Sequence, residues 1–159
     1  MKVAVYPGSF DPVTLGHVDI IERSLKLFDQ VVVLIATSSQ KKELFSVAEK
    51  KDMLREVFKN EQRVLMDATE GLLVDYARTQ KVAAIVRGLR AVSDFEYEFQ
   101  MASMNKRLYP EVETIFMMAS DQNHFISSQL VREVARLGGN LKGIVHPYIE
   151  KKLKEKFKL

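Results

Sequence analysis

The hydrophobic positions of this chain form short apolar runs separated by longer segments with a helical period. Five of these runs predict β-strands: Val3 to Tyr6, Val31 to Ala36, Val64 to Met66, Val82 to Val86 and Thr114 to Met118. The runs are apolar throughout instead of alternating with polar residues, which is typical of strands covered on both faces. We therefore expect a sheet that lies between helices.

The segments between the runs place apolar residues three and four positions apart, as amphipathic helices do. They predict helices at Gly16 to Phe28, Val47 to Phe58, Gly71 to Gln80 and Asp94 to Leu108. Ser46 with Glu49, and Ser93 with Glu96, have the spacing of a capping box and mark two helix starts.

Two further helices follow the fifth strand. The first begins at Ser127 or Ser128 and runs to about Leu137, where Gly138-Gly139 ends it, and Pro147 suits the first turn of the second. Alternating strands and helices predict an α/β fold with a Rossmann-like, doubly wound, five-stranded parallel sheet. We expect one domain over residues 1–159, closed by a C-terminal helix.

Composition agrees with one globular domain. The chain has 159 residues, of which 47% are hydrophobic, so it can bury one core but is short for two domains. It has no cysteine, which excludes disulfides and cysteine nucleophiles and fits a cytoplasmic protein. The beginning of the chain lacks the pattern of a signal peptide, and its longest apolar run is far shorter than the roughly 20 residues of a membrane-spanning helix.

The net charge is concentrated at one end of the chain. Residues 151–159 contain five lysines and one glutamate, so they account for more than the net charge of +3 and leave residues 1–150 at −1. A basic body that would indicate nucleic-acid binding is therefore absent. The lysines are typical of the solvated face of a terminal helix, with a polyanion-binding tail as the alternative.

In doubly wound folds, ligands bind beyond the carboxyl ends of the strands. The segments that follow the predicted strands are Pro7 to His17, Thr37 to Lys42, Asp67 to Leu73, Arg87 to Arg90 and Ala119 to Gln129. They are rich in histidine, lysine, arginine and hydroxyl side chains. The sequence therefore predicts a polar site along one edge of the sheet.

The segment Tyr6 to His17 combines glycine and proline in a turn that leads into a helix. Gly8 and Gly16 let a phosphate approach the backbone, and the helix N-terminus presents free N–H groups to it. His17 can donate to a phosphoryl oxygen as negative charge builds in a transition state. A lone histidine beside a turn is equally often a surface or capping residue, and the whole string, not the T-x-G-H motif alone, favours function.

Two later segments carry cations. Ser38-Ser39-Gln40-Lys41-Lys42 follows the second strand, where a lysine can contact an anionic nucleophile as a mobile point charge, although paired lysines are often only solvated. Arg87 and Arg90 flank Gly88 and can meet phosphate oxygens bidentately. Alternatively, they form an ion-pair network with nearby carboxylates, and both can coexist.

The segment Ser120 to Gln129 leads into a helix and offers hydroxyl and N–H groups suited to pyrophosphate, although a serine N-cap alone is common.

The chain lacks G-x-S-x-G and H-E-x-x-H motifs, which argues against the commonest hydrolases. A phosphate monoester has its second pKa near about 6, so it is already an anionic nucleophile and needs no general base.

These segments, in this order, resemble the nucleotidyltransferase superfamily and, within it, the phosphopantetheine adenylyltransferase family. The string R-G-L-R-x-x-x-D-F-E-Y-E is highly specific, and T-x-G-H marks the superfamily. The resemblance implies that 4′-phosphopantetheine attacks the α-phosphate of ATP, with Mg²⁺, to give dephospho-coenzyme A and pyrophosphate. It also implies a homohexamer, a dimer of trimers, and feedback by coenzyme A, without nucleic-acid or membrane partners.

The resemblance assigns roles residue by residue. Catalytic roles are implied for His17, Lys41 and Arg90, and contacts with the phosphopantetheine substrate for Ser9, Lys41, Leu73 and Arg87. Contacts with ATP are implied for Ser9, Phe10, His17, Gly88, Leu89, Arg90, Glu98, Asn123, His124, Phe125, Ile126, Ser127, Ser128 and Gln129. Family members often have threonine in place of Ser9, and some have a tryptophan in the stretch that corresponds to Asn123-His124-Phe125.

Other functions stay open from the residues alone. A related nucleotidyltransferase that acts on nicotinamide mononucleotide, or on an alcohol phosphate with CTP, shares the same turn. A non-catalytic ATP-binding module is the alternative from a different class. A class I aminoacyl-tRNA synthetase is excluded by the length of the chain and by the absence of a K-M-S-K-S loop.

Overall fold

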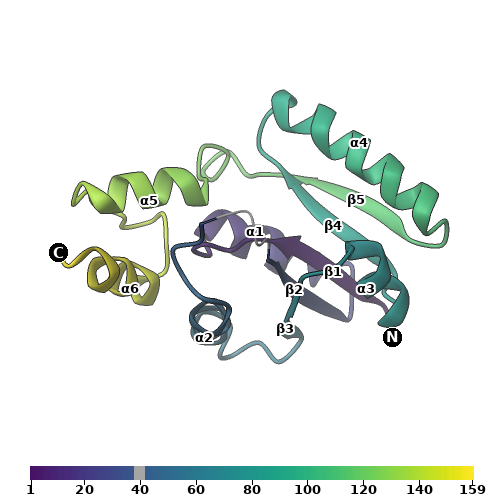
Figure 1. Cartoon of the computed structure of the whole chain (residues 1–159), viewed down its shortest axis with the longest axis horizontal. Helices are drawn as coiled ribbons and strands as arrows, with labels where there is room; N and C mark the ends of the chain where they lie inside the picture. Colours follow the sequence, from purple (N-terminus) through teal and green to yellow (C-terminus); the bar gives the residue numbers. More distant parts are fainter. Residues whose placement is uncertain (38–41) are drawn as a thin grey trace.

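The computed structural model describes residues 1–37 and 42–159, which form a five-stranded sheet with helices on both faces (Figure 1). The strands are β1 (Val3–Gly8), β2 (Gln30–Ala36), β3 (Val64–Thr69), β4 (Ala84–Leu89) and β5 (Glu113–Met118). The helices are α1 (Leu15–Ser24), α2 (Val47–Val57), α3 (Leu73–Thr79), α4 (Val92–Leu108), α5 (Ser128–Arg136) and α6 (Pro147–Phe157). The predicted α/β fold is confirmed.

All strand pairs are parallel, and the strand order is β3-β2-β1-β4-β5. The chain moves outward from β1 through β2 to β3 and then returns to β4 on the other side of β1. The order therefore reverses between β1 and β4, and ligands in doubly wound sheets bind at this point.

The residues of the central strands alternate between two cores. Val31, Val33 and Ile35 of β2 belong to the larger core, which α1, α2, α5 and α6 cover. Val32 and Leu34 point to the opposite face and pack with residues of α3 and the end of α4. Because both faces of β1 and β2 are covered, every residue between the two ends of each strand is buried.

The two edge strands, β3 and β5, are less buried than the sequence predicts for strands covered on both faces. In β3 only Val64 is buried, and β5 is partly exposed along its whole length. An edge strand has a neighbouring strand on one side only, so the helices that cover the sheet leave its outer margin open.

Helix boundaries agree with local chemistry at three places. Ser46 and Glu49 form the predicted capping box, with Glu49 N–H to Ser46 Oγ at 3.2 Å and Ser46 N–H to Glu49 Oε2 at 2.7 Å. Gly138, with φ of 73°, ends α5, and Pro147 occupies the first turn of α6.

Two helix predictions are wrong. Helix α1 ends at Ser24 instead of Phe28, because the next residues form a tighter turn in which Leu27 donates to Ser24 O at 3.0 Å. The capping box at Ser93 does not form: α4 begins at Val92 after Ala91, without a side-chain cap. Asp94 accepts the backbone N–H of Arg90 instead, at 3.2 Å.

The C-terminal lysines lie on the surface of α6 and face carboxylates. Lys154 pairs with Glu150 at 2.9 Å, and Lys156 reaches Glu49 of α2 at 3.0 Å. This arrangement fits the prediction of a solvated helix face. In the described part of the chain, no helix has both the length and the apolar character needed to cross a membrane.

Candidate active site

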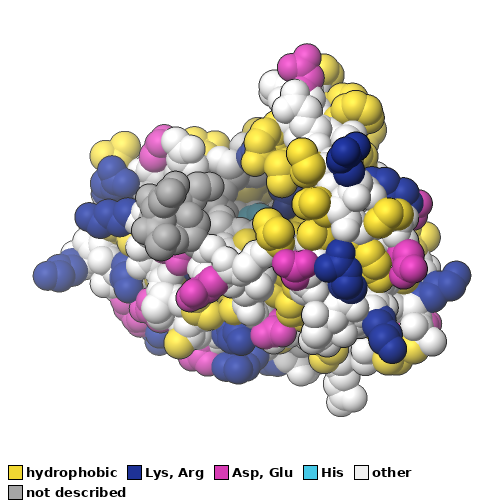
Figure 2. All heavy atoms as spheres, turned by 45° about the vertical axis from the view of Figure 1, so that its right-hand side comes forward, with side chains coloured by type: hydrophobic (Ala, Val, Ile, Leu, Met, Phe, Trp, Pro, Cys, Tyr) yellow, Lys and Arg dark blue, Asp and Glu magenta, His cyan; other side chains and the backbone are white. Residues whose placement is uncertain are grey.

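Two cavities lie beyond the carboxyl ends of the strands, at the point where the strand order reverses. The first, of about 530 Å³, is bounded by the ends of β1 and β4 and the starts of α1 and α5. The second, of about 440 Å³, lies toward β2, β3 and α4. Figure 2 shows the molecular surface hollowed at this edge, with a histidine side chain visible inside.

The two cavities share one wall. It is formed by residues that line both of them: Pro7, Gly8, Ser9, Arg87 and Glu98. Gly8 leaves room for the buried ring of Phe10, because a Cβ atom at that position would lie 3.1 Å from it. The backbone of residues 7–9 and the side chains of Arg87 and Glu98 therefore face both cavities.

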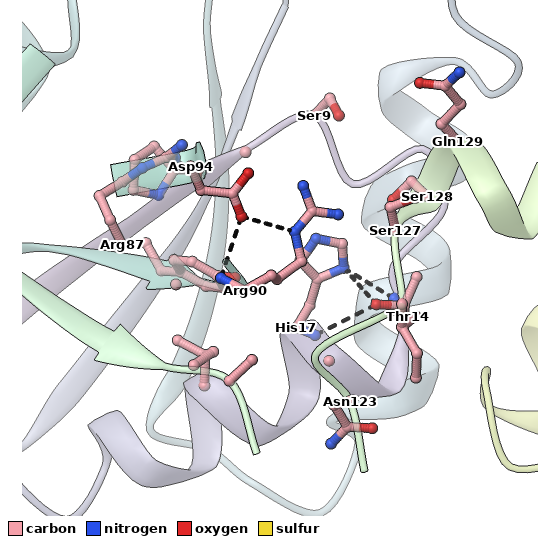
Figure 3. A pocket seen from close by; sticks show the side chains of 18 of the residues that line it. Ser9, Thr14, His17, Arg87, Arg90, Asp94, Asn123, Ser127, Ser128 and Gln129 are labelled. Carbon is pink, nitrogen blue, oxygen red and sulfur yellow. Dashed lines mark hydrogen bonds and ion pairs between the residues drawn. The ribbon is translucent and has the colours of Figure 1, made fainter. Parts of the chain in front are cut away.

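His17 is fixed in the first turn of α1 by the N-cap residue Thr14. The backbone N–H of Thr14 donates to His17 Nδ1 at 3.0 Å, and the backbone N–H of His17 approaches Thr14 Oγ1 at 3.4 Å (Figure 3). A backbone N–H can only donate, so Nδ1 is the acceptor and a neutral His17 carries its proton on Nε2. Nε2 is then available as a hydrogen-bond donor.

The surroundings keep His17 neutral. Burial, and then the positive charges of Arg90 and Arg87, lower the pKa of His17 to about 4. Figure 3 shows the imidazole beside the guanidinium of Arg90, at the bottom of the first cavity. The site therefore presents a neutral N–H donor near two cations, which is an arrangement suited to stabilising negative charge.

Arg87 holds the shared wall in place. Its Nε donates to Glu98 Oε2 at 2.7 Å and its Nη2 to Glu98 Oε1 at 2.5 Å, while Nη1 donates to Pro7 O at 2.7 Å. The ion pair joins β4 to α4, and the third bond joins β4 to β1. The expected ion-pair network of the R-G-L-R segment is therefore present, and Arg87 also lines both cavities.

Arg90 extends over the first cavity from the end of β4. Its side chain is partly exposed and lies 3.3 Å from Asp94 Oδ2 of α4. Because only one of its nitrogen atoms is engaged in this pair, the rest of the guanidinium can contact an anion.

The start of α5 forms the opposite side of the first cavity. Ser127 caps the helix by accepting the backbone N–H of Leu130 at 3.1 Å, and Ser128 Oγ donates to Pro12 O at 2.8 Å. Figure 3 places Ser127, Ser128 and Gln129 on the side facing Ser9. This N-terminus brings the positive end of the helix dipole to the cavity.

The structure brings most of the predicted site residues together. The first cavity is lined by Ser9, His17, Arg87, Gly88, Arg90, Glu98, Asn123, Ile126, Ser127, Ser128 and Gln129. Ser9, Leu73 and Arg87 line the second. Lys41 lies outside the described residues.

Four residues that were predicted to contact ATP line neither cavity, and their contacts stay predictions. Phe10 is 1% exposed and packs beneath the shared wall, and Leu89 lies at the last position of β4 without reaching the space. His124 and Phe125 pack against each other, with ring centroids 5.8 Å apart, and Phe125 is exposed.

Several residues that line the cavities were not predicted to contact a ligand. Arg132 of α5 and Asp94 of α4 line the first cavity, and Glu43 and Asn105 line the second. Helical periodicity was the available signal for Arg132, which lies one turn beyond Ser128 and so on the same face of α5. Glu43 has no comparable signal, because it lies in an irregular segment.

Comparison with known proteins places the chain among nucleotidyltransferases. A family model described as cytidylyltransferase-like matches residues 5–134. The phosphopantetheine adenylyltransferase of Desulforudis audaxviator is 56% identical over 157 residues, which cover 99% of this chain and 96% of that protein. The phosphopantetheine adenylyltransferase of Dictyoglomus turgidum is 54% identical over 159 residues, which cover 100% of this chain and 99% of that protein.

Solved structures share the fold at low sequence identity. A nicotinate-nucleotide adenylyltransferase described as putative, from Vibrio parahaemolyticus, superposes with a TM-score of 0.71 at 18% identity, covering 100% of this chain and 98% of that one. At this identity the likeness concerns the fold alone.

Proposed function

This chain belongs to the phosphopantetheine adenylyltransferase family, and we propose that it transfers the adenylyl group of ATP to 4′-phosphopantetheine, giving dephospho-coenzyme A and pyrophosphate. One observation carries this proposal: two cavities of substrate size share one wall, and one of them holds a neutral histidine donor. A reaction that joins two substrates requires such a meeting point.

We assign the first cavity to ATP and name it the nucleotide cavity. The N-terminus of α5, with Ser127, Ser128 and Gln129, suits the β- and γ-phosphates, because its N–H groups and dipole favour anions. Arg90 supplies a mobile cation over the same space. His17 Nε2–H, at the bottom of the cavity, would donate to the α-phosphate.

We assign the second cavity to 4′-phosphopantetheine and name it the acceptor cavity. Arg87 and the hydroxyl of Ser9 lie at the wall where the acceptor phosphate must approach ATP, and Leu73 offers an apolar surface to the pantetheine chain. A role of Lys41 at the acceptor phosphate is part of the same proposal and rests on the family resemblance.

The chemical step needs little from the protein besides positioning and charge stabilisation. An oxygen of the acceptor phosphate, already ionised at neutral pH, forms a bond to the α-phosphorus of ATP as the bond from that phosphorus to the bridging oxygen breaks. Pyrophosphate leaves with the bonding electrons. His17 donates a hydrogen bond to the charge that develops at the α-phosphate and does not need to transfer its proton.

Mg²⁺ is proposed as a companion of ATP. Among the described residues, no cluster of three or more histidine or acidic side chains could hold a metal ion. Mg²⁺ in nucleotide sites is commonly held largely by phosphate oxygens and water, and we propose that mode here. The chain's own contributions are the donors and cations described above.

We also propose assembly into a homohexamer in the cytoplasm. Helix α4 exposes apolar side chains, among which Val92 is 85%, Tyr97 63% and Phe99 55% exposed, and apolar side chains gather beside the hollow in Figure 2. Patches of this kind commonly mark contacts between subunits.

Inhibition by coenzyme A is proposed on the basis of the family resemblance. Coenzyme A carries both a pantetheine arm and an adenine nucleotide.

A substrate panel tests the proposed activity. Pyrophosphate release is measured with ATP plus 4′-phosphopantetheine, ATP plus nicotinamide mononucleotide, and CTP plus an alcohol phosphate. We expect rapid release with the first pair only. Preference for another pair would assign a related nucleotidyltransferase activity, and ATP binding without release from any pair would indicate a non-catalytic module.

A further inference from the structure

The carboxylate of Asp11 holds the two residues Leu44 and Phe45, which lie just before α2. Asp11 lies in the turn between β1 and α1 and is only 4% exposed. Its Oδ2 accepts the backbone N–H of Leu44 at 2.8 Å, and its Oδ1 accepts that of Phe45 at 2.9 Å. Each carboxylate oxygen therefore holds one amide of a segment 33 or more positions away in the sequence.

The same residue is held from the opposite side by α5. Arg132 Nη1 donates to the carbonyl oxygen of Asp11 at 2.5 Å and lies 3.8 Å from Asp11 Oδ2. Ser128, one turn earlier in α5, donates to the carbonyl oxygen of Pro12 at 2.8 Å. Both Arg132 and Ser128 line the nucleotide cavity, so that cavity is in direct contact with the turn that carries Asp11.

The segment that Asp11 holds reaches the acceptor cavity. Glu43, next to Leu44, lines that cavity, and its Oε1 lies 3.0 Å from Lys50 Nζ in an ion pair that lacks hydrogen-bond geometry. Lys50 belongs to α2 and is fully buried. The position of Glu43 therefore depends on Lys50 on one side and on the amides bound by Asp11 on the other.

We propose that Asp11 is a positioning residue that couples the two cavities, because it connects Arg132 at one of them to Leu44 and Phe45 at the other. A nucleotide that contacts Ser128 and Arg132 restrains α5 and the turn. Opening of the hydrogen bonds from Leu44 and Phe45 to Asp11 then becomes less favourable. By linkage, an acceptor that orders this segment favours nucleotide binding to the same extent.

Hydrogen exchange of the Leu44 and Phe45 amides tests the coupling. A non-hydrolysable ATP analogue with a methylene group between the α- and β-phosphates is added to saturation, and exchange is followed residue by residue by mass spectrometry. We expect about fivefold or greater slowing at both amides, the lower end of usual coupling strengths. The amide of Glu61, which donates to Phe58 O at 2.9 Å in a distant turn, is the internal reference and should be unaffected.

Two variants test whether the coupling between the cavities passes through Arg132 and Asp11. Arg132→Gln removes the contact between α5 and the Asp11 carboxylate but keeps the bonds to Leu44 and Phe45. Asp11→Asn replaces one acceptor oxygen by an amide donor, so one of those two bonds is lost. At saturating analogue, the slowing should fall below about twofold in both variants. Asp29→Asn is the matched control, since Asp29 accepts the backbone N–H of Lys2 at 2.6 Å far from the cavities.

The outcomes separate this inference from the proposed function on which it rests. If the analogue binds and the exchange of Leu44 and Phe45 stays unchanged, or if Arg132→Gln responds like the unmodified protein, the coupling is refuted and the proposed function stands. If the analogue does not bind at all, the coupling and the proposed function are both refuted. Should Asp11→Asn fail to fold, Arg132→Gln decides the question alone.

Discussion

The ring of Phe10 meets the ring of His17 edge to face, with ring centroids 5.0 Å apart. Phe10 is buried, and its φ of 46° is unusual for a residue other than glycine. The surrounding core must therefore hold this backbone conformation, and the phenyl ring supports the imidazole from below.

Phe10→Leu should reduce turnover without weakening ATP binding. Loss of the aromatic contact lets His17 shift, and a small displacement of a catalytic group lowers kcat by about tenfold or more. We expect the KM for ATP to stay within about twofold, because the side chain does not line the nucleotide cavity. Phe58→Leu, a buried substitution outside both cavities, controls for lost stability. A raised KM with unchanged kcat would instead support a direct contact with ATP.

His17→Ala should lower kcat by roughly 10²- to 10³-fold, the usual effect of removing one donor to developing negative charge. The Kd for ATP should change little, since the donor acts mainly in the transition state. Turnover and calorimetric binding are measured side by side. His146→Asn is the control, because asparagine can still cap α6 in place of His146. Unchanged turnover would remove His17 from the mechanism.

The free protein should keep His17 neutral throughout the range in which an ordinary histidine titrates. Burial and the nearby Arg90 and Arg87 lower the pKa of His17 to about 4, so its NMR signals should not shift between about pH 8 and pH 5. Below the ordinary value of 6.5 the unfolded chain binds this proton and the folded protein does not. The contribution of His17 to the unfolding free energy therefore decreases as the pH falls from 6.5 toward 4. A midpoint near 6.5 would contradict the burial of the neutral ring.

Arg87→Lys should raise the KM for 4′-phosphopantetheine by about tenfold. Lysine cannot reproduce the two parallel bonds to Glu98 together with the bond to Pro7 O, so the shared wall loses its geometry although the charge remains. The KM for ATP should rise less. Arg78→Lys, in an exposed pair with Asp75, provides the control. Equal increases in both KM values would show that the wall is not specific to the acceptor.

The pair of the buried Lys50 and the partly exposed Glu43 should respond unequally to substitution. Glu43→Ala leaves the buried ammonium without its partner and should reduce the unfolding free energy by about 3–5 kcal/mol. Lys50→Met removes the buried charge, and Glu43 can turn to solvent, so the loss should stay below about 1 kcal/mol. Urea unfolding of both variants measures the difference. A larger loss for Lys50→Met would mean that the ion pair itself stabilises the fold.

Much of the fold follows from patterns in the sequence. The five apolar runs identify the strands, and the strand-end rule brings His17, Arg87 and Ser128 to one cavity. Strand ends were less accurate: β4 was predicted at Val82 to Val86 but spans Ala84–Leu89. Arg87 and Gly88 extend the strand because they pair with β5, and local polarity does not reveal that pairing.

The unpredicted parts of the site depend on contacts between distant segments. The sequence indicates only that Asp11 lies in a turn. Its hydrogen bonds with the amides of Leu44 and Phe45 form only when the chain folds. The family resemblance implies an ATP contact for Phe10, but it does not reveal the conformation of this residue. Its left-handed backbone places the ring in the core.

The wall around Gly8 and Ser9 separates two compartments that are built mostly from different parts of the chain. Helix α4 lines the acceptor cavity more than any other element does, whereas the phosphate-facing groups of the nucleotide cavity come from α1, α5 and the end of β4. During evolution the acceptor cavity can therefore change to fit a different acceptor while the residues of the nucleotide cavity are inherited unchanged. A protein engineer who wishes to change the acceptor has the same freedom, provided that the partition itself is left alone.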